Sequence, residues 1–335
     1  MKRVLSVCLV AAMALTMLFV VGCGDKTKTP DTTTPETLKF GAGVYVSAPT
    51  ATDATADKDG SGKIDVTVAA VTVDADGKIV ACDVDTASNT VAFTADGKAV
   101  ANDNFKTKGE QGKDYNMVAY GGAKKEWFDQ ADAFEKLVAG KTLTEVKALV
   151  AAENKGNDDV VAAGCTIMIH EFVGAIEKAY NSAETSKATA KDTVKVTVFT
   201  EQTCTDATAD KDGSNKVSTT VFAAAIGADG KVTAAHTDCV EVSFTFTTEG
   251  VSTLDTTKAV LSKGEQGADY NMVAYGGAKK EWFEQADAFA ASCIGKTASE
   301  IAGFEAEGGK ANADVQNAGC TIIVTGFVKA AEKIK

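Results

Sequence analysis

The strongest constraint on the fold of this chain is an internal repeat. Residues 108–134 recur at 263–289 with only two differences, Lys113/Ala268 and Asp129/Glu284. A chain that repeats itself in this way builds one supersecondary unit twice. We therefore predict a repeat domain at 38–180 and a second at 192–335, joined by a polar linker at 181–191. We also expect each repeat to fold independently, with no core residue in the linker.

Hairpin signals come first in each repeat. Ile64–Val73 and Lys78–Val84 are rich in β-branched residues and flank an Asp-Gly turn, which is typical of a β-hairpin. We expect a further strand at Thr90–Phe93. The second copy repeats the pattern around Asp229-Gly230.

Helical spacing follows the strands. Apolar side chains from Trp127 to Val138 fall on one helical face, which predicts a helix from about Lys124. Thr142 with Glu145, and Thr297 with Glu300, have the spacing of a capping box, and an apolar closing helix ends each repeat. Strands followed by helices predict an α+β fold, in which two tandem antiparallel sheets each carry helices packed on them.

The first residues predict export. Lys2 and Arg3 precede an apolar run that ends in Val20-Val21-Gly22-Cys23, which resembles the lipobox of bacterial lipoproteins. The resemblance implies a signal peptide at 1–22 and a lipidated Cys23. Residues 23–37 are polar and contain two of the three prolines, so we expect a disordered tether. The predicted location is the extracytoplasmic face of the cell membrane, with the membrane as partner through the lipid anchor.

The charge balance argues against nucleic acid as a partner. The chain has 46 acidic residues against 34 Lys and Arg, for a formal net charge of −12. An acidic surface repels phosphate backbones.

Metal and redox motifs are sparse. Asp57, Asp59 and Asp65 match part of an EF-hand calcium loop, but Val68 stands where the bidentate Glu is needed. We favour a solvated turn leading into a strand. The two histidines, His170 and His236, are not at equivalent positions, so a duplicated histidine-dependent active site is not predicted. A Cys82–Cys165 disulfide and free buried thiols are both open alternatives.

The remaining candidate functional residues lie in the repeated block, which comprises residues 108–134 and 263–289. Trp127 and Phe128 are expected to anchor the helix to the sheet. Four tyrosines next to Gly-Gly pairs are candidates to line a flat ligand pocket, with the helix N-terminus facing an anion. They are Tyr115 and Tyr120 in the first copy, and Tyr270 and Tyr275 in the second.

Four sequence features follow one another in the first repeat: Glu110–Gly112, Trp127–Phe134, Gly140-Lys141 and Asp159–Thr166. The second repeat has the same four features in the same order, the last of them at Asp314–Thr321. This order resembles the FMN-binding domain of extracytoplasmic electron-transfer proteins, which include tandem-domain flavolipoproteins. Cys165 and Cys320 stand where that family has Ala. The resemblance implies FMN esterified to Thr166 and Thr321 by a flavin transferase, with Asp159 and Asp314 in the motif. Redox partners would then exchange electrons with the flavins.

Two functions therefore remain open. One is an electron-transfer relay with two FMN-binding-like domains, and the other is a non-redox surface lipoprotein whose duplicated domains bind a ligand or a protein. Both describe a binding or carrier protein more readily than a stand-alone catalyst.

Overall fold

The computed structural model of the chain describes residues 36–334. The predicted signal peptide, Cys23 and most of the predicted tether lie outside the described residues. The elements of the first repeat are β1 (Lys39–Val46), β2 (Thr50–Thr52), β3 (Gly60–Val73), β4 (Ile79–Phe93), β5 (Ala99–Val100), α1 (Lys108–Gln111), η1 (Gly112–Tyr115), α2 (Trp127–Val138), α3 (Leu143–Lys147), η2 (Ala152–Asn154), α4 (Asp158–Ala163) and α5 (His170–Asn181).

A short strand in the predicted linker leads to the second repeat. The remaining elements are β6 (Glu184–Thr185), β7 (Thr193–Thr205), β8 (Gly213–Ile226), β9 (Val232–Phe246), α6 (Lys263–Gln266), η3 (Gly267–Tyr270), α7 (Trp282–Cys293), α8 (Ala298–Ala302), η4 (Glu307–Gly309), α9 (Ala313–Ala318) and α10 (Thr325–Ala331).

Each repeat contains one antiparallel sheet, as predicted. The first sheet has the order β5-β4-β3-β1-β6, with β2 paired to β3, and the second has the order β7-β8-β9. The hairpins of β3 with β4 and of β8 with β9 are confirmed. The separate strand expected at Thr90–Phe93 was wrong, because these residues continue β4 without a break. The polar residues before Thr90 stay extended because β3 pairs with them along its whole length.

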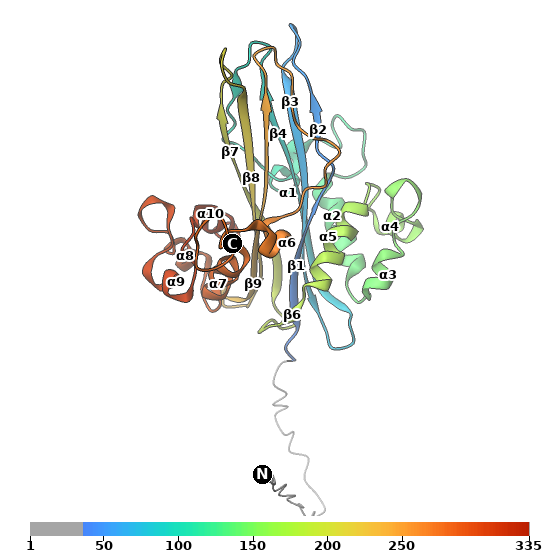
Figure 1. The fold of residues 1–335 in the computed structure, drawn as a ribbon. Coiled ribbons are helices and arrows are strands. Elements are labelled where there is room, and N and C mark those ends of the chain that lie inside the picture. The colour runs from blue at the N-terminus through green and yellow to red at the C-terminus, as the bar shows by residue number, and fades with distance from the viewer. Residues whose placement is uncertain (1–35, 335) are drawn as a thin grey trace, which may run out of the picture. The chain divides into compact units, whose positions relative to one another are not determined.

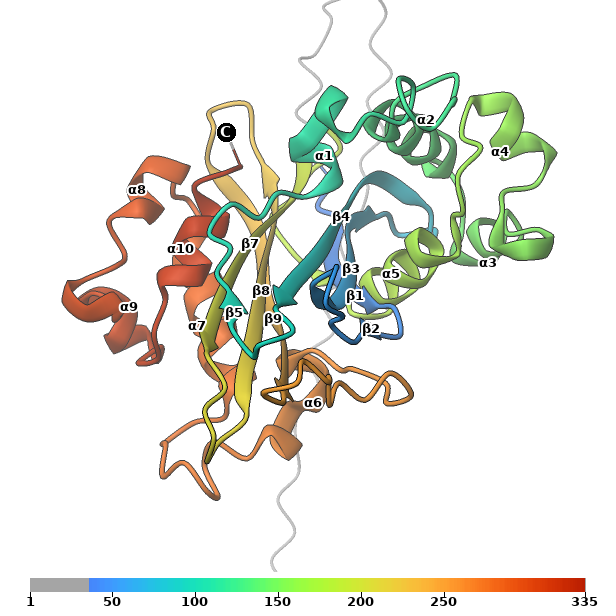
Figure 2. The same ribbon diagram turned by 90° about the horizontal axis from the view of Figure 1, so that it is seen from above.

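Residues 36–334 form four layers, with helices on the outer face of each sheet and the two sheets packed against one another (Figures 1 and 2). Side chains of β3 alternate between the two faces, because successive residues of a strand point to opposite sides. Val66, Val68 and Ala70 enter the core between the sheets, while Ala69 and Val71 enter the core under the helices. The second repeat has a helix-side core of its own, built around Phe222 and Phe289.

The core between the sheets belongs to both repeats. It joins side chains of β1, β3 and β4 to side chains of β7, β8 and β9, including stacked Phe93 and Phe246 at 4.7 Å between ring centroids. The expectation that the linker supplies no core residue was wrong, because Ala188 is fully buried in this core. The described residues form one compact unit.

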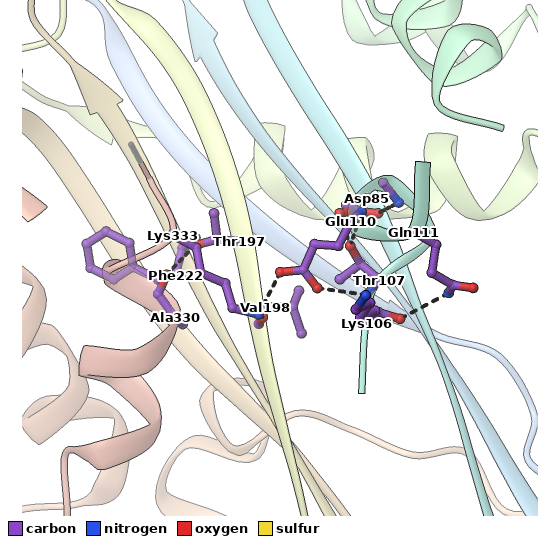
Figure 3. A network of polar contacts seen from close by, with 11 residues as sticks. Asp85, Lys106, Thr107, Glu110, Gln111, Thr197, Val198, Phe222, Ala330 and Lys333 are labelled. Carbon is purple, nitrogen blue, oxygen red and sulfur yellow. Dashed lines mark hydrogen bonds and ion pairs between the residues drawn. The ribbon is translucent and has the colours of Figure 1, made fainter. Parts of the chain in front are cut away.

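Reciprocal ion pairs also join the repeats. Lys333 Nζ lies 2.6 Å from Glu110 Oε1, and the equivalent Lys178 Nζ lies 2.5 Å from Glu265 Oε1. Each lysine also donates to a backbone carbonyl of its own repeat, Val198 in the pair that Figure 3 shows and Val44 in the other. The same surface is thus used on both sides, as in a two-fold symmetric dimer.

Local capping signals fixed several helix starts. The predicted capping boxes of α3 and α8 are present, with Thr142 and Thr297 accepting from the backbone of Glu145 and Glu300. The first helix of the repeated block is capped in the same way, by Thr107 with Glu110. The long helix α2 begins at Trp127, three residues later than expected. The Glu126 carboxylate binds the amides of Met117 and Val118, and this holds the preceding residues in a loop.

Candidate functional site

Thr166 and Thr321 occupy equivalent turns between two helices. Each follows a glycine with positive φ, Gly164 at 101° and Gly319 at 115°, which ends the preceding short helix. Left-handed backbone favours glycine because it has no Cβ. Neither threonine lies in a strand, and both are exposed to solvent. Each turn therefore places a threonine at the surface of the protein.

A buried glutamine holds each turn. Gln130 Oε1 accepts hydrogen bonds from Thr166 N at 2.8 Å and from Thr166 Oγ1 at 3.0 Å, while its Nε2 donates to Lys125 O at 3.1 Å. Gln285 repeats these contacts with Thr321 and Lys280. Because both glutamines are almost fully buried, their amide groups depend on these partners. We name each set of Gln, Thr and preceding Gly the Thr turn.

A lysine lies beside each Thr turn. A Cβ placed on Gly164 would lie 2.4 Å from Lys125 Nζ, and one on Gly319 would lie 2.4 Å from Lys280 Nζ. Burial raises the pKa of the adjacent Cys165 thiol to about 11, and the charge of Lys125 opposes this shift. The ammonium group of Lys125 therefore lies beside Gly164 and close enough to Cys165 to act on it electrostatically.

An open hollow adjoins the first Thr turn. It has a volume of about 610 Å³ and is lined by Lys125 and Ala163, next to the turn, together with Asp129, Asp132, Ala133, Lys136 and Leu137 of α2. Four of these side chains are charged, and Ala133, Leu137 and Ala163 are apolar.

The four candidate tyrosines are not gathered in one pocket. Tyr120 and Tyr275 are 88 % and 89 % exposed. Tyr115 and Tyr270 are half-buried instead, beneath Lys108 and Lys263, whose Nζ atoms lie 5.6 and 5.1 Å from the ring centroids.

The other sequence candidates are placed as follows. Asp159 and Asp314 are exposed in the first turns of α4 and α9. Asp57 and Asp59 line a hollow at the tip of the first sheet, but Asp65 lies within β3 and pairs with Lys63 at 2.8 Å. Among residues 36–334 no three acidic, His or Cys side chains form a group suited to a metal ion. Cys82 and Cys165 are both free thiols.

Sequence reasoning missed Gln130 and Gln285. The only available signal was their identity within the repeated block, which nothing in local spacing explains. It also missed a pair of half-buried acidic residues near the junction of the repeats. There Asp83 Oδ2 accepts from Val196 N at 2.7 Å, and Glu135 Oε1 accepts from Val84 N at 2.9 Å.

No family model, curated protein or solved structure matches this chain. Within the described part of the chain, no helix has the length and apolar character needed to cross a membrane.

Proposed function

We propose that the chain is a membrane-anchored, extracytoplasmic lipoprotein that carries FMN on Thr166 and Thr321 and serves as an electron-transfer relay. The observation that carries the proposal is the pair of equivalent Thr turns. Each has an exposed threonine whose hydroxyl donates to a buried glutamine, and the glycine of each turn lies beside a lysine. A phosphoester requires an accessible hydroxyl, and its phosphate is stabilised by a nearby cation.

The residues fit the phosphate end of FMN. Thr166 Oγ1 would be the esterified atom, Lys125 would neutralise the phosphate, and the hollow on α2 would receive the ring system. Gln130 would keep its hydrogen bond to Thr166 N after esterification, so that the turn keeps its shape. Bound FMN supplies the redox chemistry, and this chain supplies attachment and position.

The two Thr turns lie on different helical layers. Thr166 follows α4 and Thr321 follows α9, and these helices flank opposite sides of the paired sheets (Figure 1). Two flavins at these positions would not stack on one another. Each would face its own surroundings, which suits a carrier that meets a donor and an acceptor on different sides.

Mass spectrometry tests the attachment sites. The exported protein, produced together with a flavin transferase, should be yellow after acid precipitation and carry two added FMN groups. Thr166→Val and Thr321→Val should each remove one group, and the double variant should carry none. Thr144→Val, which removes an exposed hydroxyl from α3, is the matched control and should keep both. A colourless protein of unmodified mass would defeat the proposal and favour the ligand-binding alternative.

The anchor requires a separate test, because it depends on sequence alone. Cys23→Ser should release the protein from membranes or block its maturation, since the thiol of Cys23 is the predicted site of lipidation. Membrane fractionation with N-terminal sequencing measures both effects. Unchanged partition together with unchanged processing would contradict the lipoprotein assignment.

A further inference from the structure

The buried face of α2 contains one polar side chain, Gln130, and the buried face of α7 contains one at the equivalent position, Gln285. The other buried residues of the two helices are apolar, namely Trp127, Ala131, Phe134 and Val138 in α2, and Trp282, Ala286, Phe289, Ala290 and Cys293 in α7. Burying an amide group costs free energy unless hydrogen bonds replace those that it made with water. Methionine has a similar length and would fill the same space without that cost. Packing alone therefore does not account for a glutamine at this position.

The amide group of each glutamine has only one orientation that satisfies its neighbours. Gln130 Oε1 accepts from Thr166 N at 2.8 Å, and Gln130 Nε2 donates to Lys125 O at 3.1 Å. Exchanging the two amide atoms would place a donor against the N–H of Thr166 and an acceptor against the carbonyl of Lys125. The second Thr turn repeats both contacts, at 2.9 and 3.1 Å. The backbone therefore fixes the position of the glutamine oxygen.

The same oxygen also holds the threonine side chain. Gln130 Oε1 accepts from Thr166 Oγ1 at 3.0 Å, and Gln285 Oε1 accepts from Thr321 Oγ1 at 2.9 Å. Within residues 36–334 neither hydroxyl forms another hydrogen bond. An exposed threonine without such a partner exchanges among staggered χ1 rotamers, whereas one acceptor shared by N and Oγ1 selects a single rotamer. The O–H bond then points at the glutamine, and the lone pairs of Oγ1 point away from it.

We propose that Gln130 and Gln285 are positioning residues for flavin attachment, an inference that rests on the proposed function. In the attachment step a bond forms between threonine Oγ1 and the phosphorus of an activated flavin nucleotide that contains a pyrophosphate. The P–O bond to the departing nucleoside monophosphate breaks, and the hydroxyl loses its proton. A neutral amide does not take up this proton, so the base belongs to the flavin transferase and the glutamine only orients the nucleophile.

The rate of flavin attachment at each threonine tests this role. The full chain is exported together with the transferase, and peptide mass spectrometry follows Thr166 and Thr321 separately over time. Gln130→Met should slow attachment at Thr166 by roughly threefold or more, because only one of three staggered rotamers is then productive. Attachment at Thr321 in the same molecule should not change. Gln111→Met, which removes a hydrogen bond to Lys106 O on α1, is the matched control and should leave both rates unchanged.

A conservative variant separates orientation of the hydroxyl from stability of the turn. Gln130→Glu keeps an oxygen that accepts from both atoms of Thr166, so it should restore most of the rate. It also buries a charge, so its melting temperature should be no higher than that of Gln130→Met. NMR scalar couplings of the unmodified protein report χ1 of Thr166 without any flavin. They should show one rotamer in the wild type and in Gln130→Glu, and an average in Gln130→Met.

The possible results distinguish this inference from the proposed function. A wild type that carries two FMN groups, with an unchanged rate at Thr166 in Gln130→Met, would overturn the positioning role alone. So would averaged couplings in the wild type, or a Gln130→Glu variant as slow as Gln130→Met. A wild type without FMN would overturn the proposed function and this inference together.

Discussion

At the residue scale, half-buried carboxyl groups are the most unusual feature of the junction between the repeats. Burial, together with the charges of Asp83 and Asp132, raises the pKa of Glu135 to about 8, while the Val84 amide and Lys195 oppose the shift. A carboxyl whose pKa is higher in the folded state binds its proton more tightly there. Its contribution to stability is therefore full below about pH 4.5 and is lost as the pH rises through about 8.

Replacing Glu135 with glutamine tests this linkage. Glu135→Gln keeps an oxygen that accepts from Val84 N but removes the charge. We expect little change in the free energy of unfolding at pH 5 and a gain of about 1–2 kcal/mol at pH 9. Urea denaturation at both pH values measures the difference. The exposed Glu201→Gln is the control, and a gain of equal size at pH 5 and pH 9 would contradict the assignment.

At the element scale, the short helices α1 and α6 connect the repeats. Glu110 has two roles, since its Oε2 accepts from Thr107 N at 2.9 Å within the capping box and its Oε1 pairs with Lys333. Glu265 does the same with Ser262 and Lys178. Glu110 and Glu265 therefore make the same contacts in the two copies of Lys-Gly-Glu-Gln. This shared role is a physical reason for their identity within the repeated block.

Removing one of these lysines should weaken the junction modestly. Lys333→Met loses the ion pair with Glu110 and the hydrogen bond to Val198 O, and we expect a loss of about 1 kcal/mol because the pair is partly exposed. Lys178→Met should cost a similar amount, and the two losses should add. Chemical denaturation measures both.

Lys329→Met, near the same end of the chain as Lys333, is the control for these two variants. Lys329 contacts only Glu332, at 4.0 Å, among the ion pairs of the described residues, so Lys329→Met should leave stability nearly unchanged. A loss in Lys329→Met as large as in Lys333→Met would show that the effect is not specific to the junction.

At the scale of the whole molecule, the shared core makes the repeats interdependent. Val196, Val198, Val217 and Val221 of the second sheet are buried against the first sheet. Without the first repeat this apolar face would meet water, at a cost of roughly 25 cal/mol per Å² of apolar surface. Apolar faces of this kind drive association between chains.

A fragment of residues 192–335 should therefore not be a stable monomer. We expect a homodimer or a larger species, in which the exposed sheet of one copy covers that of another, as the two repeats do in the intact chain. Light scattering after size-exclusion chromatography gives the mass, and residues 36–335 serve as the monomeric reference. A monomeric fragment with a cooperative thermal melt would instead support the independent folding expected from sequence.

The sequence by itself determined the duplication, the α+β order, the two hairpins and the capped helix starts. These features depend on residues close in sequence, such as Thr142 with Glu145, whose side chains meet within one helical turn. Sequence likewise singled out Thr166, but its exposure and its hydrogen bonds to Gln130 depend on how α4 packs beside α2.

Only the tertiary structure decided that the two sheets share a core. It also decided that a groove lies between β1 and β9. The run from Val66 to Val73 is apolar on both faces, yet that pattern cannot identify which element covers each face. A groove of about 980 Å³ is lined by residues as far apart in the chain as Gly41 of β1 and Ala290 of α7. Contacts between distant segments are set by the free energy of the whole packed molecule, and local spacing carries no record of them.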